Sequence, residues 1–214
     1  MRKTERSIFV LLLSVVLLLI FMHFVSRNLS PVLYDRFNMD AEANIPTWYS
    51  TVLLFSVALA SLNIYLSNKA KRYDESLWRF FWLGFSAAYC FFSIDEAARI
   101  HEILDDLKII KWIVVYAPIC GLFLIVSMYY FAVIRKDDRQ LRNWVIGGLF
   151  TYVFGAIVAE GFSCLLYPLP PTMQHIEFVI EEGCELAGTI IVLMGCLMEI
   201  VRIHRSPSID RAVQ

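Results

Sequence analysis

Six long apolar runs constrain the fold of this chain more than any other feature. They occupy residues 7–27, 47–68, 78–104, 111–134, 143–167 and 175–203. Because the hydrocarbon core of a membrane is about 30 Å thick, a helix needs about 20 residues to cross it, and each run has that length. The apolar share of the chain is 58%, above the roughly 45–50% of soluble domains. We therefore predict an all-α fold, an integral membrane bundle of six transmembrane helices, as a single domain over residues 1–214.

Basic residues indicate the orientation of this bundle. Lysine and arginine favour the cytoplasmic loops of membrane proteins. In this chain they collect in the stretches 2–6, 69–79, 135–142 and 202–211. Because consecutive runs cross the membrane in opposite directions, these four stretches all fall on the same side of the membrane. Both termini are therefore expected in the cytoplasm. The net charge of −1 gives no electrostatic reason to expect a nucleic-acid partner, so membrane lipid is the expected partner, and a homo-oligomer is left open.

A polar site is predicted at the outer ends of the runs, where most ionisable residues within apolar sequence fall. Charged side chains are costly in hydrocarbon and usually face an interior cavity. Those in this chain are His23, Asp95, Glu96, Arg99, His101, Glu102, Glu160, His175, Glu181, Glu182 and Glu185. They come from four different runs, so a shared cavity at that end of the bundle would explain them together.

Helical spacing groups these residues into two stripes. Asp95, Arg99 and Glu102 share one face of the third run. Glu96 is expected to point away from this face. On the sixth run the second stripe includes Glu182 and Glu185. If the stripes face each other, their carboxylates cannot all stay ionised unless they pair with Arg99 or bind a cation, so some must otherwise hold protons.

The favoured interpretation is a metal-dependent membrane enzyme. Imidazole and carboxylate ligands suit zinc, iron or manganese, so a divalent metal is the expected cofactor and a lipid or quinone-like molecule the expected substrate. The expected metal ligands are His23, His101, Glu102, His175, Glu182 and Glu185. The expected catalytic carboxyl groups are Glu160, Glu182 and Asp95. Arg99, Glu96 and Glu181 are expected to orient the ligands through hydrogen bonds.

Two other interpretations stay open. The acids could carry protons or cations in a channel or transporter, although Glu199 is the only acid expected in the inner half of the bundle. Alternatively, Arg99 could neutralise Asp95 and Glu182 in a structural ion-pair cluster, as in a sensor or an assembly subunit.

Three short segments resemble a known group of proteins. They are Glu42-Ala43-Asn44-Ile45-Pro46-Thr47-Trp48-Tyr49, Ser93-Ile94-Asp95-Glu96 through His101-Glu102, and Glu181-Glu182-Gly183-Cys184-Glu185. Together they are similar to an uncharacterised group of bacterial multi-pass membrane proteins. The resemblance implies a bacterial inner (plasma) membrane location and carries no activity with it.

Overall fold

The computed structural model describes residues 2–67, 75–106, 112–159 and 170–205, and within these ranges the chain is helical, without strands. Six helical segments have the length and hydropathy of membrane spans: 3–29, 45–66, 76–98, 112–134, 139–159 and 172–205. The six predicted spans and the all-α class are therefore confirmed at the level of helix length and composition. Their insertion in a membrane and their orientation stay predictions.

The helices follow the predicted runs with a few additions. In chain order they are α1 (Lys3–Leu29), α2 (Pro31–Phe37), α3 (Ile45–Leu66), α4 (Glu75–Ala98), α5 (Ile100–Asp106), α6 (Trp112–Tyr129), the π-helix η1 (Tyr130–Ile134), α7 (Arg139–Val153), the π-helix η2 (Phe154–Ala159) and α9 (Pro171–Arg205). The short helix α2 lies in the connector between α1 and α3. A proline helps to start α3, because Pro46 in the first turn lacks only an amide that would have no helical partner there.

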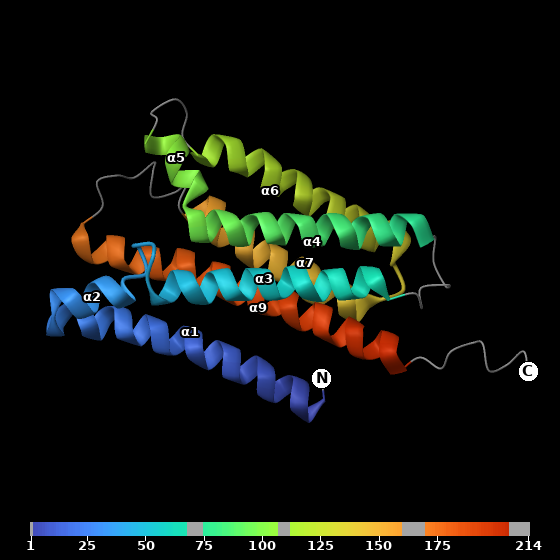
Figure 1. Cartoon of the computed structure of the whole chain (residues 1–214), viewed down its shortest axis with the longest axis horizontal. Helices are drawn as coiled ribbons and strands as arrows, with labels where there is room; N and C mark the ends of the chain where they lie inside the picture. Colours follow the sequence, from blue (N-terminus) through green and yellow to red (C-terminus); the bar gives the residue numbers. More distant parts are fainter. Residues whose placement is uncertain (1, 68–74, 107–111, 160–169, 206–214) are drawn as a thin grey trace, which may run out of the picture.

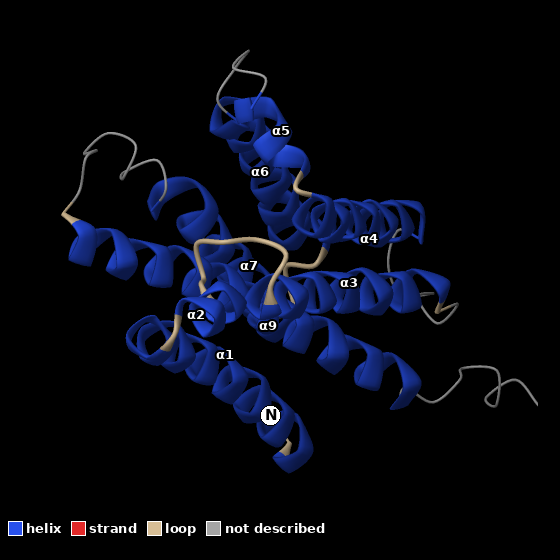
Figure 2. Ribbon diagram, turned by 60° about the vertical axis from the view of Figure 1, so that its left-hand side comes forward, coloured by secondary structure: helices blue, strands red, loops and turns tan. Residues whose placement is uncertain are grey.

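The long helices run side by side and give the molecule two distinct ends. Figure 1 shows the N-terminus and the end of α9 at one end, with α2 and α5 at the other. Helix α3 packs against both α4 and α9, and α7 packs against α9. Helix α1 lies at the edge of the bundle beside α2 and α9 (Figure 2).

Two glycines let α7 and α9 approach each other closely. A Cβ atom added at Gly188 would lie 2.5 Å from the backbone nitrogen of Tyr152, and one at Gly148 would lie 2.7 Å from the carbonyl oxygen of Gly188. Backbone atoms cannot rotate away as side chains can. Any larger residue at either position would therefore force these two helices apart.

The third predicted run is not one continuous helix. Arg99 adopts a left-handed conformation with φ 56°, which ends α4 at Ala98 and starts α5 at Ile100. This conformation is uncommon for a residue with a Cβ atom. The predicted stripe through Asp95, Arg99 and Glu102 is therefore wrong, because the helical spacing on which it depends is interrupted at its middle residue.

Buried ion pairs join α7, η1 and α9 at the end that carries the termini. Arg135, whose side chain is 1% exposed, donates to Asp138 at 2.8 Å and to Glu199 at 3.2 Å. Arg202 also pairs with both carboxylates. Glu199, expected as the only acid in this half, is thus held between two arginines. Asp138 also caps α7 by accepting from the amide of Leu141.

Candidate acidic cavity

A cavity of about 710 Å³ opens at the end of the bundle where α2 and α5 lie. The described residues that line it include nine carboxylate side chains: Asp40, Glu42, Asp95, Glu96, Glu102, Glu177, Glu181, Glu182 and Glu185. They come from the α2–α3 connector, α4, α5 and α9. Most of the predicted cluster is therefore gathered in one place, although the residues that complete it differ from those expected.

Asp95 contacts both Tyr116 and His101 in the cavity. Its Oδ1 atom accepts from the hydroxyl of Tyr116 at 2.8 Å and from the backbone amide of His101 at 2.9 Å. Its Oδ2 atom lies 3.1 Å from Nδ1 of His101. The turn at Arg99 makes these contacts possible, because it folds α5 back over the end of α4. With both oxygens occupied in this way, Asp95 holds α5 and α6 against α4.

His101 bridges two carboxylates. Its Nδ1 atom faces Asp95 and its Nε2 atom lies 3.1 Å from Glu42. Burial alone would lower the pKa of this imidazole, but its hydrogen bonds to Asp95 and Glu42 and their negative charges raise the pKa to about 10. His101 is therefore a fixed cation at neutral pH. Both ring nitrogens then donate, and a metal ion could bind there only after an ion pair had been broken.

Arg99 lies at the rim of the cavity. Its guanidinium pairs with Glu42 at 2.9 Å and also with Glu102. These contacts replace the expected pairing of Arg99 with Asp95 in the structural interpretation. Asp95 receives its positive partner from His101 instead. The connector residue Glu42 therefore joins the two cations, and it ties the α2–α3 connector to α5.

Glu96 lies in the cavity wall, so the prediction that it points elsewhere is wrong. The break at Arg99 does not explain this, because Asp95 and Glu96 precede it on the same helix. Adjacent positions on a helix differ by about 100°. A cavity that wraps around the end of α4 is wide enough to admit both.

The α9 wall carries four carboxylates within nine residues: Glu177, Glu181, Glu182 and Glu185. Among the described residues that line the cavity, His101 is the only cationic side chain. Burial and, after it, the crowding of negative charge both act on Asp40 in the connector. Burial, with the negative charges of Glu177 and Glu102, raises the pKa of its carboxyl group.

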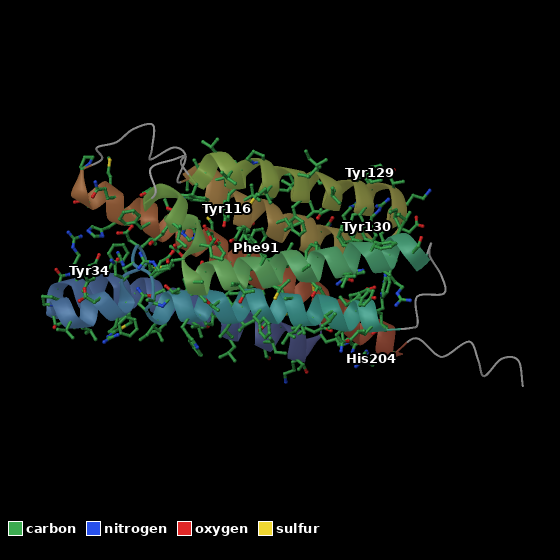
Figure 3. The ribbon with its side chains drawn as sticks, turned by 45° about the horizontal axis from the view of Figure 1, so that its top comes forward. Tyr34, Phe91, Tyr116, Tyr129, Tyr130 and His204 are labelled. Atoms are coloured by element: carbon green, nitrogen blue, oxygen red, sulfur yellow. The ribbon has the colours of Figure 1, made fainter. Side chains whose placement is uncertain are left out.

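Aromatic rings cover the part of the cavity nearest α6. Trp112 and Tyr116 pack edge to face with their centroids 5.5 Å apart, and the centroid of Trp112 lies 5.4 Å from that of His101. Phe92, Tyr152 and Phe178 complete the aromatic lining. Figure 3 shows Tyr116 toward the α5 end of the bundle, whereas Tyr130 lies toward the end that carries the termini. Aromatic faces attract cations, so the aromatic and acidic parts of the lining favour the same kind of ligand.

The predicted metal ligands are divided between two places. His101, Glu102, Glu182 and Glu185 line the cavity. His23 and His175 lie next to each other outside its lining, with their ring centroids 5.5 Å apart. In the part of the chain that the structure describes, no three histidine, cysteine or acidic side chains are arranged to hold one metal ion. The metal site stays a prediction, and Glu160 lies outside the described residues.

Several lining residues were missed by the prediction from sequence. Asp40, Glu42 and Glu177 were not predicted as site residues, although Glu42 belongs to the Glu-x-Asn-Ile-Pro segment. Trp112 resembled an ordinary interfacial aromatic, and Tyr116 was given no role. Only the Glu42 segment offered a sequence signal; the others depend on how the connector and α6 pack.

Comparisons with known proteins give a family and no function. Residues 8–200 match a family described as "Domain of unknown function (DUF8692)". No curated protein and no solved structure matches the chain.

Proposed function

The chain belongs to the DUF8692 family, and we propose that it is a multi-pass inner membrane protein that binds a cationic solute in its acidic cavity and transports it. The observation that carries this proposal is the excess of carboxylates over cations among the described residues that line one open cavity. In the described part of the chain nine acids line it, together with His101, and Arg99 pairs with Glu42 at the rim. Such closely spaced carboxylates can all remain ionised only if cations lie among them. Without cations, some of the carboxyl groups must hold protons.

The spread of the carboxylates favours a solute over a tightly coordinated metal. A metal ion needs several ligands converging within about 2–2.6 Å, whereas these acids are distributed over a wall that spans α4, α5 and α9. The cavity volume of about 710 Å³ is within the roughly 300–1,000 Å³ of small-molecule sites. Charge spread over the wall, together with aromatic rings, suits a solvated or organic cation.

Orientation follows from the basic residues. Arg135 and Arg202 lie at the end opposite the cavity, with the basic N-terminus at the same end. Because such residues favour the cytoplasm, we place both termini inside and the cavity on the outer face. Below the cavity the core contains the buried aromatic side chains Trp82, Phe85 and Tyr89. This arrangement fits a transporter that is open outward and closed inward.

Cation binding is tested by thermal unfolding of the purified chain in detergent. The probes are K⁺, Mg²⁺, Mn²⁺ and spermidine, each added separately. A probe at about 100 times its Kd adds about 2.7 kcal/mol, or roughly 5–10 °C in Tm for a chain of this size. Glu182→Gln and Glu185→Gln should reduce the shift. Asp137→Asn, which alters an exposed acid at the opposite end, should not. No shift with any probe would contradict cation binding.

Transport is tested separately in liposomes. The cation that raises Tm should cross the membrane with the wild-type chain and fail to cross with Glu182→Gln. Binding without flux would remove transport and retain the binding site.

The metal-dependent enzyme remains a second proposal, with a lipid or quinone-like substrate. Glu102, Glu182 and Glu185 in one cavity are the observation in its favour. Elemental analysis of the purified wild type and of Glu182→Ala would decide it. A stoichiometric metal that is lost in the variant would support catalysis, and a metal-free wild type would remove this proposal.

A further inference from the structure

A second group of polar side chains lies beside the acidic cavity, at the outer ends of α1, α2 and α9. The ring centroids of His23 and His175 are 5.5 Å apart, and the ring of Tyr34 lies 5.6 Å from that of His23. Arg27, one turn beyond His23 on α1, interacts electrostatically with all three rings. We call these four residues the histidine cluster. Figure 3 shows Tyr34 at the end of the bundle opposite His204.

The hydrogen bonds of His23 fix where its proton lies. The backbone amide of Met39 donates to Nδ1 of His23 at 3.0 Å. The carbonyl of Phe37 is also close to this ring, but the amide of Met39 has the geometry of a hydrogen bond. A neutral imidazole carries one proton, so an accepting Nδ1 places that proton on Nε2. Nε2 is therefore a donor and has no lone pair for a metal ion.

Two ring nitrogens of the cluster lack partners. His23 is 0% exposed, and its Nε2 atom has no hydrogen-bond partner among the described residues. The same holds for the buried Nδ1 atom of His175. A buried donor without an acceptor is unfavourable. An oxygen atom between the two rings could accept a hydrogen bond from Nε2 of His23. A ligand could bring this oxygen atom in past His175 and Tyr34, which are only partly buried.

The charge near the histidine cluster indicates whether the ligand that supplies this oxygen atom is an anion. The charged group that acts on both imidazoles is Arg27, which is exposed. Asp40, which lines the acidic cavity, and Asp35 act on Tyr34. An anion placed toward Arg27 and the two histidines would meet one positive charge and several donors. Arginine and imidazole donors together suit a phosphate group.

We propose that the histidine cluster binds a phosphate group, with Arg27, Nε2–H of His23 and the ring of His175 as its contacts. The group comes either from a phospholipid head group or from a soluble phosphate. The surface beside the cluster fits the first source, because Phe21, Phe24 and Leu29 of α1 are exposed and could lie along acyl chains. The site is separate from the acidic cavity and does not depend on cation binding.

The proposal is tested by NMR of the delipidated chain in detergent, labelled with ¹⁵N-histidine. The chain has four histidines, so single variants assign every signal. The probes are inorganic phosphate, phosphatidylglycerol and the phosphate-free lipid diacylglycerol. We expect His23 to carry its proton on Nε2, and the His23 and His175 signals to shift with phosphatidylglycerol, with phosphate, or with both. The signal of His204 should stay unchanged.

A matched pair of arginine variants tests the contribution of charge. Arg27→Gln should weaken binding about tenfold, as expected for the loss of a charged hydrogen bond, whereas Arg36→Gln on α2 should bind like the wild type. Shifts with the lipid alone assign a head group, and shifts with free phosphate alone assign a soluble ligand. A proton on Nδ1 of His23, no shift with either phosphate probe, equal shifts with diacylglycerol, or equal weakening by Arg36→Gln would each overturn the proposal.

Discussion

Replacing His101 with glutamine should make the chain less stable and should remove part of its dependence on pH. In the folded chain the pKa of His101 is raised from 6.5 to about 10. A group with a raised pKa contributes fully below its unfolded value of 6.5, and its contribution falls as pH rises until it is lost above about 10. At about 1.4 kcal/mol per pKa unit, the upper bound of this contribution is about 5 kcal/mol.

The assay is thermal unfolding in detergent at pH values from 6 to 10.5. Tyrosine and lysine also titrate near pH 10, so the informative quantity is the difference in Tm between wild type and His101→Gln. We expect this difference to be largest near pH 6 and to shrink as pH rises. His204→Gln, at the exposed end of α9, serves as the control. A constant difference across the range, or an NMR titration of His101 near 6.5, would refute the ion-pair bridge.

Two further predictions concern packing and the buried charges. Gly188→Ala should lower the free energy of unfolding by about 1–3 kcal/mol, because its Cβ would lie 2.5 Å from a backbone nitrogen. Gly121→Ala, with no atom within 4 Å of the added Cβ, should be neutral or stabilising. Equal Tm values for the two variants would contradict the close approach of α7 and α9. Glu199→Gln should cost about 2 kcal/mol, less than the 3–5 kcal/mol of a fully broken buried pair, because Asp138 still pairs with Arg135. Unfolding in detergent measures this loss, and a variant as stable as Asp137→Asn would show that the pair contributes nothing.

The six spans could be predicted because hydropathy and length are properties of single segments. The side of the bundle that holds the acids could also be predicted, because each span reverses the direction of the chain. Depth along a helix, however, does not give the direction in which a side chain points around the bundle. His23, His101 and His175 were assigned to one site on depth alone, and the structure puts His101 in the cavity and the other two beside it.

The break at Arg99 could not be predicted from its neighbours. A left-handed residue is usually glycine or asparagine, and arginine gives no such signal. The connector was equally hard to predict, because its path depends on tertiary contacts. The side chain of Asn44 binds the carbonyl groups of Asn38 and Ala41, and this arrangement accompanies the entry of Asp40 and Glu42 into the cavity wall.

The left-handed turn at Arg99 also gives a sequence pattern that indicates whether a related protein keeps the ion pair between Asp95 and His101. It fixes the interval from Asp95 to His101 at six positions, since one residue more or less would rotate the imidazole away from its carboxylate. A relative that keeps Asp, five residues and then His should retain the internal cation, even if glycine stands in place of Arg99 and the rim ion pairs are lost. A relative with an insertion in that interval should have lost the bridge, whatever its overall similarity.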